Sequence, residues 1–221
     1  MKVSVFGTGN MGRAIGTRLV SGGNDVQVLA TEPEKGAELV EELRGKAASG
    51  ASVEGGASGD PVGGDVVVLA VWYDAARSIV EQQGEQLAGK VIVDITNPVD
   101  TATFDGLVTP LDSSAAVEIA KKAPGGAKVV KAFNTTFAAT LVDGEVAGQP
   151  LDVFIAGDDD DAKAKVVELV QASGLNPIDA GPLKRARGAR APRPAPHDAP
   201  GRAGHGVRER REDPQLTAGI S

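Results

Sequence analysis

Apolar residues in the first thirty positions follow two different patterns. Residues 2–6 and 26–29 are short apolar runs that are rich in Val. Between them, residues 11–20 carry their apolar side chains at helical spacing. These patterns predict a strand, a helix and a second strand in that order.

The rest of the chain continues the alternation of strands and helices. Unbroken apolar runs such as Asp65–Val71 and Lys90–Asp94 are typical of strands that are buried on both faces. Further strands are expected at 52–54, 128–132, 151–156 and 177–180. Helices are expected at 31–48, from after residue 73 to 87, from 113 or 114 to 123, at 137–142, and from 158 through the apolar positions 166–170. The alternation predicts an α/β fold with a doubly wound, Rossmann-type, mostly parallel sheet.

Three helix starts carry capping signals. Ser113 or Ser114 is expected to cap the helix that ends at residue 123. Thr31 followed by Glu34 forms a capping box, and Pro33 is tolerated in the first turn of the helix. Asp158 is expected to cap the helix that follows the strand at 151–156. The acidic run Asp158–Asp161 also raises the alternative of a metal site, but acids are favoured at a helix start and no convergent ligands are visible in the sequence. No metal ligand is assigned.

The motif Gly7-Thr8-Gly9-Asn10-Met11-Gly12 joins the first strand to the first helix. Gly7 permits a tight turn, and Gly9 lets the backbone approach a pyrophosphate. Gly12, with Gly16 one turn on, lets the helix lie close to the sheet. The free N–H groups at the helix start then face an anion. This arrangement predicts a dinucleotide cofactor.

The residues after the second strand do not decide between NAD and NADP. An acid at this position binds the ribose 2′-hydroxyl, whereas an arginine accepts a 2′-phosphate. Thr31 is neither, Glu32 is acidic and Lys35 is basic. The acids are explained equally well by the positive end of the helix dipole.

Other candidate residues follow the next two apolar strands. Ligands of open α/β sheets bind beyond the carboxyl ends of the strands. Trp72 and Tyr73 stand there, and so do Asn97 and Pro98. Ordinary packing is the alternative for the two aromatic residues, but their position favours at least one of them as a wall of the cofactor site.

Composition excludes several kinds of chemistry. The 221 residues include no cysteine, so disulfides, thiolate metal sites and cysteine nucleophiles are excluded. Both histidines, His197 and His205, lie near the C-terminus, so no Ser-His-Asp set is available before them. Hydride transfer needs no such group, because the cofactor carries the chemistry. No catalytic side chain is therefore assigned.

Charge and hydropathy limit the partners. The net charge is −7, but residues 182–221 hold nine Lys or Arg and four Asp or Glu, so the remainder is strongly acidic. An acidic body disfavours nucleic acid as a partner. No apolar run reaches membrane-spanning length and no signal peptide is apparent, so a cytoplasmic protein with small-molecule substrates is expected.

Five stretches together resemble the family of NADP-dependent reductases of coenzyme F420, a deazaflavin hydride carrier. They are Gly7–Gly12, Ala70–Tyr73, Asp94–Val99, Val130–Thr135 and Asp179–Arg187. The resemblance implies NADP, with NAD as the alternative, and F420 as co-substrate. It also implies a homodimer, provided that the long apolar C-terminal helix expected in the family is intact.

The resemblance implies a role for each stretch. Gly7–Gly12 hold the pyrophosphate, and Thr31 to Lys35 face the adenosine ribose. Residues bordering the nicotinamide are Ala70, Val71, Trp72, Tyr73, Asn97 and Pro98, and those on the deazaflavin side are Phe133, Asn134 and Thr135. Members that use NADP usually have Arg where Thr31 stands, so the usual clamp on the 2′-phosphate is missing here.

The composition changes abruptly after Arg187. Residues 188–221 are rich in Ala, Arg, Pro and Gly and have few bulky apolar residues. Back-translating this segment and shifting the frame can restore an apolar, family-like ending, which suggests a frameshift near Arg187. We therefore divide the chain into a dinucleotide-binding domain, 1–187, and a basic tail, 188–221, that is expected to be disordered as written. The alternative for the tail is a basic arm that binds nucleic acid or an anionic surface. The altered ending also keeps a second function open, a dinucleotide sensor without turnover.

Overall fold

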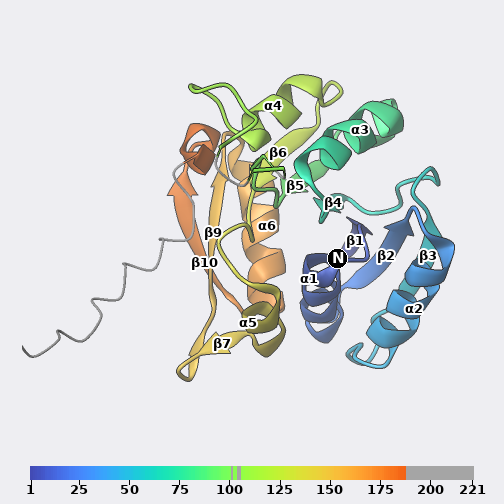
Figure 1. Cartoon of the computed structure of the whole chain (residues 1–221). Helices are drawn as coiled ribbons and strands as arrows, with labels where there is room; N and C mark the ends of the chain where they lie inside the picture. The colour runs from blue at the N-terminus through green and yellow to red at the C-terminus, as the bar shows by residue number, and fades with distance from the viewer. Residues whose placement is uncertain (101, 104–105, 188–221) are drawn as a thin grey trace, which may run out of the picture. The chain divides into compact units, whose positions relative to one another are not determined.

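The computed structural model describes residues 1–100, 102–103 and 106–187. Eight strands form one sheet in the order β10-β9-β6-β5-β4-β1-β2-β3 (Figure 1). Their bounds are β1 Lys2–Phe6, β2 Asp25–Ala30, β3 Val53–Ala57, β4 Val66–Leu69, β5 Val91–Asp94, β6 Lys128–Lys131, β9 Asp152–Gly157 and β10 Asn176–Gly181.

In the described part of the chain, six α-helices connect and cover the strands. They are α1 Asn10–Ser21, α2 Pro33–Arg44, α3 Tyr73–Gln83, α4 Ala115–Lys122, α5 Ala138–Asp143 and α6 Asp160–Ala172. Two 3₁₀ turns, η1 Gly84–Leu87 and η2 Leu183–Arg187, and a small hairpin of β7 Glu145–Val146 and β8 Gln149–Pro150 complete the described elements.

The sheet has the strand order of a dinucleotide-binding fold. Strands β1 to β6 are mutually parallel, and they lie side by side in the order β3-β2-β1-β4-β5-β6. β9 pairs with β6 in the antiparallel direction, and β10 is parallel to β9. The prediction of a doubly wound, mostly parallel sheet is confirmed.

Both faces of the central strands are buried, because successive side chains of a strand point to opposite faces. In β4, Val66 and Val68 belong to the core under α1, α2 and α6, whereas Val67 and Leu69 belong to the core under α3 and α4. This explains why these strands appear in the sequence as unbroken apolar runs.

The helix starts differ from the prediction in two places. Glu32, not Thr31, is the N-cap of α2, and no side chain caps that helix. Pro33 is favoured at the first helical position, and there it places the cap one residue later. Asp159, not Asp158, caps α6 by accepting a hydrogen bond from the Ala162 N–H at 2.9 Å. Asp158 instead accepts one from the Leu183 N–H at 2.8 Å.

Several element lengths also differ. Helix α2 ends at Arg44 rather than near residue 48, and β4 ends at Leu69, so residues 70–71 lie beyond the strand. β3 extends to Ala57 and pairs with β2 along its whole length. The hairpin of β7 and β8 was not predicted, because two-residue strands leave no periodic signal.

Candidate functional site

Four neighbouring strands end at one level of the sheet. The register pairs Phe6 of β1 with Leu69 of β4, Leu69 with Asp94 of β5, and Asp94 with Lys131 of β6. The segments that follow the strands therefore emerge side by side at the carboxyl edge, where open α/β sheets bind ligands. These segments are residues 7–12, 70–73, 95–98 and 132–135, which hold most of the residues expected in the site.

The glycine turn depends on contacts that a side chain would prevent. Gly7 has φ +109°, a conformation that residues other than glycine rarely adopt. A Cβ atom on Gly7 would overlap the carbonyl oxygen of Ala70, and one on Gly12 would overlap the carbonyl oxygen of Gly7. The predicted tight turn at Gly7 is confirmed. Gly16 serves a different contact from the one expected, because its missing Cβ makes room for Leu43 of α2 rather than for the sheet.

The start of α1 has the properties of an anion site. Gly9 is its N-cap, no side chain caps the helix, and its first turn contains no acidic residue. A Cβ atom built on Gly9 would meet nothing within 4 Å among the described residues. Thr8 is half-buried beside Gly9, Asn10 is exposed, and Met11 packs on the core. The open backbone and the uncapped N–H groups fit the pyrophosphate of a dinucleotide.

The segment after β2 carries the residues expected at the ribose. Thr31, Glu32 and Lys35 are exposed. The Lys35 ammonium lies 2.8 Å from a Glu32 carboxylate oxygen, and this hydrogen bond raises the pKa of Lys35. The basic side chain is thus already paired with an acid of its own helix.

The two aromatic residues after β4 have different surroundings. Tyr73 is 6% exposed within the core under α3, and burial raises the pKa of its hydroxyl. Arg77 lies over its ring at 5.6 Å from the centroid. Trp72 is 63% exposed at the start of α3. The alternative of ordinary packing therefore describes Tyr73, whereas Trp72 is available at the rim.

The turns after β5 and β6 contact each other. The Asn97 side-chain amide donates to the carbonyl oxygen of Asn134 at 3.0 Å, and the Asn134 amide donates to the Asn97 side-chain oxygen at 3.4 Å. Phe133 is buried and has φ +61°, which is unusual for a bulky residue. Such backbone strain is found most often at functional sites. Pro98 and Thr135 are half-buried in the same two turns.

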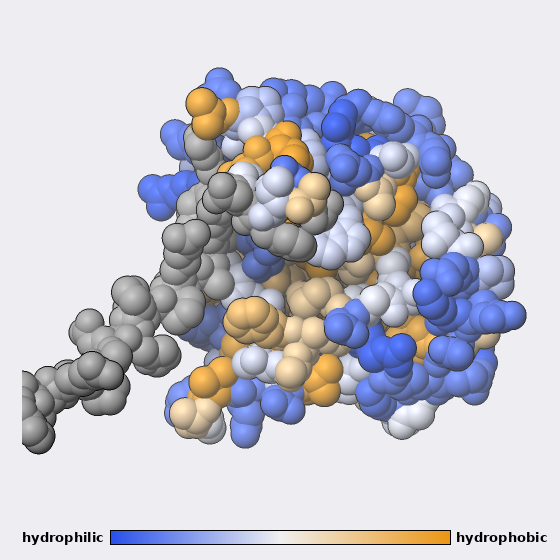
Figure 2. Space-filling model, in the orientation of Figure 1, coloured by the Kyte–Doolittle hydropathy of each residue, from blue (hydrophilic) through white to orange (hydrophobic). Residues whose placement is uncertain are grey.

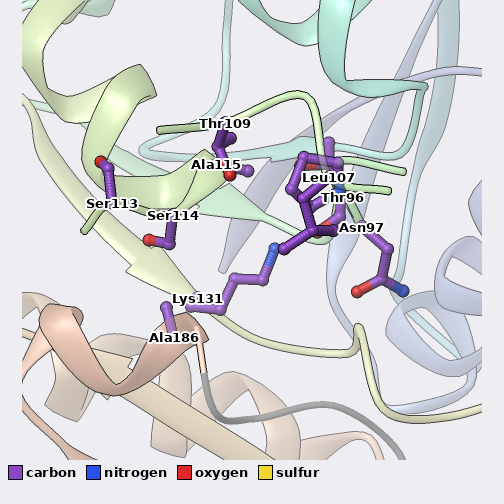
Figure 3. A pocket seen from close by; sticks show the side chains of 10 residues that line it. Thr96, Asn97, Leu107, Thr109, Ser113, Ser114, Ala115, Lys131 and Ala186 are labelled. Atoms are coloured by element: carbon purple, nitrogen blue, oxygen red, sulfur yellow. The ribbon is translucent and has the colours of Figure 1, made fainter. Parts of the chain in front are cut away.

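The sequence patterns did not predict a buried ion pair at the ends of β5 and β6, where these two turns begin. Asp94 and Lys131 are 0% and 3% exposed, and the ammonium lies 2.8 Å from the carboxylate. Burial lowers the pKa of Lys131, while Asp94 acts in the opposite direction. Figure 3 shows Lys131 extending from β6 toward the turn that holds Thr96 and Asn97. The available signals were the two charged residues that follow apolar positions at strand ends, Asp94 after Val93 and Lys131 after Val130.

The surface around the edge is divided by polarity. Figure 2 shows apolar and weakly polar residues in the middle of the face in view, with hydrophilic residues over α2 and α3.

Within the described ranges, no group of three or more His, Cys, Asp or Glu side chains is arranged to hold a metal ion. In the same part of the chain, no helix has both the length and the apolar character needed to cross a membrane.

Comparison with known proteins gives the family. The family model for NADP oxidoreductase, coenzyme F420-dependent, matches residues 2–98. The F420-dependent NADP reductase of Methanocaldococcus jannaschii is 32% identical over 203 residues, covering 85% of this chain and 86% of that protein. The chain belongs to the F420-dependent NADP reductase family. It is therefore a member of an oxidoreductase family, as the sequence motifs indicated.

Other relatives show the range of this reductase family. A crystal structure assigned as an F420-dependent NADP-reductase from Arthrobacter sp. FB24 superimposes with a TM-score of 0.73 at 32% identity, over 86% of this chain and 88% of that one. The metalloreductase STEAP3 of Rattus norvegicus is 33% identical over 84% of this chain, but the match spans 35% of that protein. The reductase fold thus also occurs as one part of a larger protein.

Proposed function

We propose that this chain transfers a hydride between NADP(H) and a deazaflavin, coenzyme F420. The observation that supports this most directly is the open, uncapped start of α1 at the same sheet edge as the Asn97–Asn134 contact. The start of α1 accommodates a pyrophosphate, and the Asn97–Asn134 contact offers amide groups at the same sheet edge. The name of the relative in Methanocaldococcus jannaschii, F420-dependent NADP reductase, agrees with this chemistry.

Each part of the edge has a proposed task. Backbone groups of residues 7–12 bind the pyrophosphate, and Ala70, Val71, Trp72, Asn97 and Pro98 border the nicotinamide. Because Tyr73 is buried, its task is to support this border through packing. Phe133, Asn134 and Thr135 orient the second ring. The nicotinamide supplies or accepts the hydride when bound, so the side chains position two rings and exclude water rather than exchange protons.

At its adenosine end, the proposed site departs from the pattern of the family. Thr31 offers a hydroxyl where an arginine would hold a 2′-phosphate, and Lys35 is paired with Glu32. The pair is exposed, so a 2′-phosphate can compete with Glu32 for the ammonium at small cost. NADP(H) is the proposed cofactor, and NAD(H) binding at comparable strength is the alternative that this segment permits.

Binding and turnover should be measured separately. Full-length protein is titrated with NADPH and with NADH by fluorescence, and NADPH oxidation is then followed with F420, with a flavin, with a quinone and with a ferric chelate. Binding of NADPH together with reduction of F420 is the expected result. Failure of both nucleotides to bind would overturn the proposal.

Two other results would replace the deazaflavin. Turnover with another acceptor alone would make the chain a reductase of that acceptor, an alternative favoured by the metalloreductase among the relatives. Binding without turnover on any acceptor would favour a dinucleotide sensor.

A further inference from the structure

A buried ion pair joins the two strands that carry the proposed ring-binding turns. Asp94 is the last residue of β5 and Lys131 is the last residue of β6, and the two are directly in register. One carboxylate oxygen of Asp94 accepts a hydrogen bond from the Lys131 ammonium, and the other accepts one from the Thr96 N–H at 2.8 Å. The ammonium also donates to the Thr96 carbonyl oxygen. Both backbone polar groups of Thr96 are therefore held by this pair.

A small cavity beside the ammonium contains unpaired hydroxyl groups. Its volume is about 20 Å³, and Lys131, Thr96 and Thr109 are among its lining residues. Thr96 is 3% and Thr109 8% exposed, and neither hydroxyl oxygen has a hydrogen-bond partner within the described ranges. A buried hydroxyl without a hydrogen-bond partner destabilises the fold. Something of matching size is expected to satisfy both.

Water fits this cavity in size and chemistry. A cavity of about 10–15 Å³ already holds one water molecule, and buried waters make about three hydrogen bonds to polar groups. The Lys131 ammonium has three hydrogens and two acceptors among the described residues. Its third hydrogen and the two threonine hydroxyls make three partners. An anion is disfavoured because Asp94 already neutralises the ammonium.

We propose that this cavity binds one internal water molecule, and that the water and the Asp94–Lys131 pair together form a positioning cluster for Asn97 and Asn134. The cluster holds the start of both turns: Asp94 begins the turn to Asn97, and Lys131 begins the turn to Asn134. The amide contact between Asn97 and Asn134 then closes the frame. Through Thr109 the water also ties the segment before α4 to this frame.

Stability alone is a weak reason for such a pair. Desolvation of two buried charges offsets most of their attraction, and replacement of both by neutral groups is often neutral or stabilising. What the charged pair adds, compared with a neutral pair, is that it holds the backbone geometry of the turn at Thr96. This assigns Asp94 and Lys131 as positioning residues, in a role that rests on the proposed function.

The test uses full-length protein with the variants K131M, D94N and D94N/K131M. K131M should be the least stable, because it leaves a buried carboxylate unpaired, and the double variant should recover much of that loss. If the pair positions the turns, the double variant should still show a kcat lowered by about tenfold, with the KM for NADPH changed by less than about threefold. Recovery of both stability and kcat in the double variant would overturn the positioning role.

A second readout needs no cofactor. The side-chain amide signals of Asn97 and Asn134 in the ¹⁵N–¹H spectrum of the free protein should shift in D94N/K131M and remain in place in a matched surface variant, E168Q. Unchanged signals would contradict the inference even if the wild type is inactive. Failure of the wild type to bind any nucleotide would instead contradict the proposed function, so the two failures can be told apart.

The water is tested by crystallography of the wild type and T109V. An ordered water within hydrogen-bond distance of the Lys131 ammonium and both threonine hydroxyls is expected in the wild type and should be lost or displaced in T109V. An empty cavity in a well-resolved wild-type structure would overturn the water site.

Discussion

Gly9 and Gly12 belong to the same turn, but an added Cβ atom would meet different surroundings at each. At Gly9 it would point into open space, and at Gly12 it would overlap the carbonyl oxygen of Gly7. One glycine therefore keeps a surface free for a ligand, whereas the other permits the turn itself. Substitution by alanine separates these two tasks.

We expect G9A to lower the affinity for NADPH by about tenfold or more, because the methyl group occupies the space of the pyrophosphate. Its cost in stability should stay within about 1 kcal/mol, the usual difference between Gly and Ala at an N-cap. G12A should instead lower the free energy of unfolding by about 1–3 kcal/mol through overpacking. Urea unfolding and nucleotide titration of both variants check this. Equal effects of the two variants on stability would contradict the assignment.

A second residue-scale prediction concerns the choice between nucleotides. T31R should raise the preference for NADPH over NADH by about tenfold, because a hydrogen bond between charged groups contributes about 1.5–3 kcal/mol. The ratio of kcat/KM values for the two nucleotides is the measurement, and T31A is the control for loss of the hydroxyl. An unchanged ratio in T31R would show that Thr31 does not face the 2′ position.

At the scale of elements, the start of α6 shows how one acidic run serves three structural contacts. Asp158 accepts a hydrogen bond from the Leu183 N–H, Asp159 caps the helix, and Asp160 pairs with Lys163. The run predicted as a helix start is therefore used by the fold, although the cap is one residue later than expected.

The cap makes a pH-dependent prediction. Two hydrogen bonds lower the pKa of Asp159 from its ordinary value of 3.8. The larger effect comes from the Ala162 N–H, and the next comes from the Lys128 ammonium. A carboxyl whose pKa is lower in the folded state stabilises the fold above its unfolded pKa, and that contribution is lost as the pH falls through the folded value. D159N should thus lower the urea midpoint at pH 7, and the difference from wild type should shrink below about pH 3.8.

The matched control is E168Q, which removes one exposed acid from the same helix. It should change the midpoint less than D159N does at pH 7. Equal changes in both variants, or a D159N effect that does not shrink as the pH falls below about 3.8, would contradict a role for the ionised cap.

For the whole molecule, the last described element is η2, which ends at Arg187. Leu183 and Ala186 of η2 pack in the core under α3 and α4, and the last strand, β10, precedes them. Residues 188–221, which carry the predicted tail and the frameshift hypothesis, lie outside the described residues. None of the relatives described above covers more than 86% of this chain.

We expect truncation after Arg187 to leave the urea midpoint and the cooperativity of unfolding unchanged, because residues 188–221 hold few bulky apolar side chains that a core could bury. Denaturation of the full and the truncated chain, with light scattering for their oligomeric state, is the measurement. A lower midpoint would show that residues 188–221 contribute to the fold. Sequencing the gene around the Arg187 codon tests the frameshift hypothesis separately, and an unbroken frame would reject it.

Much of the fold could be predicted because it depends on short-range rules. The glycine turn, the unbroken apolar strands and the cap at Ser114, which accepts from the Val117 N–H, all have local signatures. The exact start of α6 could not be predicted, because Asp158 and Asp159 are adjacent residues that are both able to cap. The distant contact of Asp158 with Leu183 decided between them. At α2 the start was set locally, by Pro33 at the first helical position.

By itself, the sequence determined the α/β alternation, the strand-turn-helix unit at the start and the stretches that lie at the carboxyl edge, since each follows from the spacing of nearby residues. Tertiary structure alone decided that Tyr73 is buried while Trp72 is exposed, and that Asp94 pairs with Lys131. Those outcomes depend on which strands become neighbours and at what register. That information lies in contacts between residues far apart in the chain, where no local pattern records it.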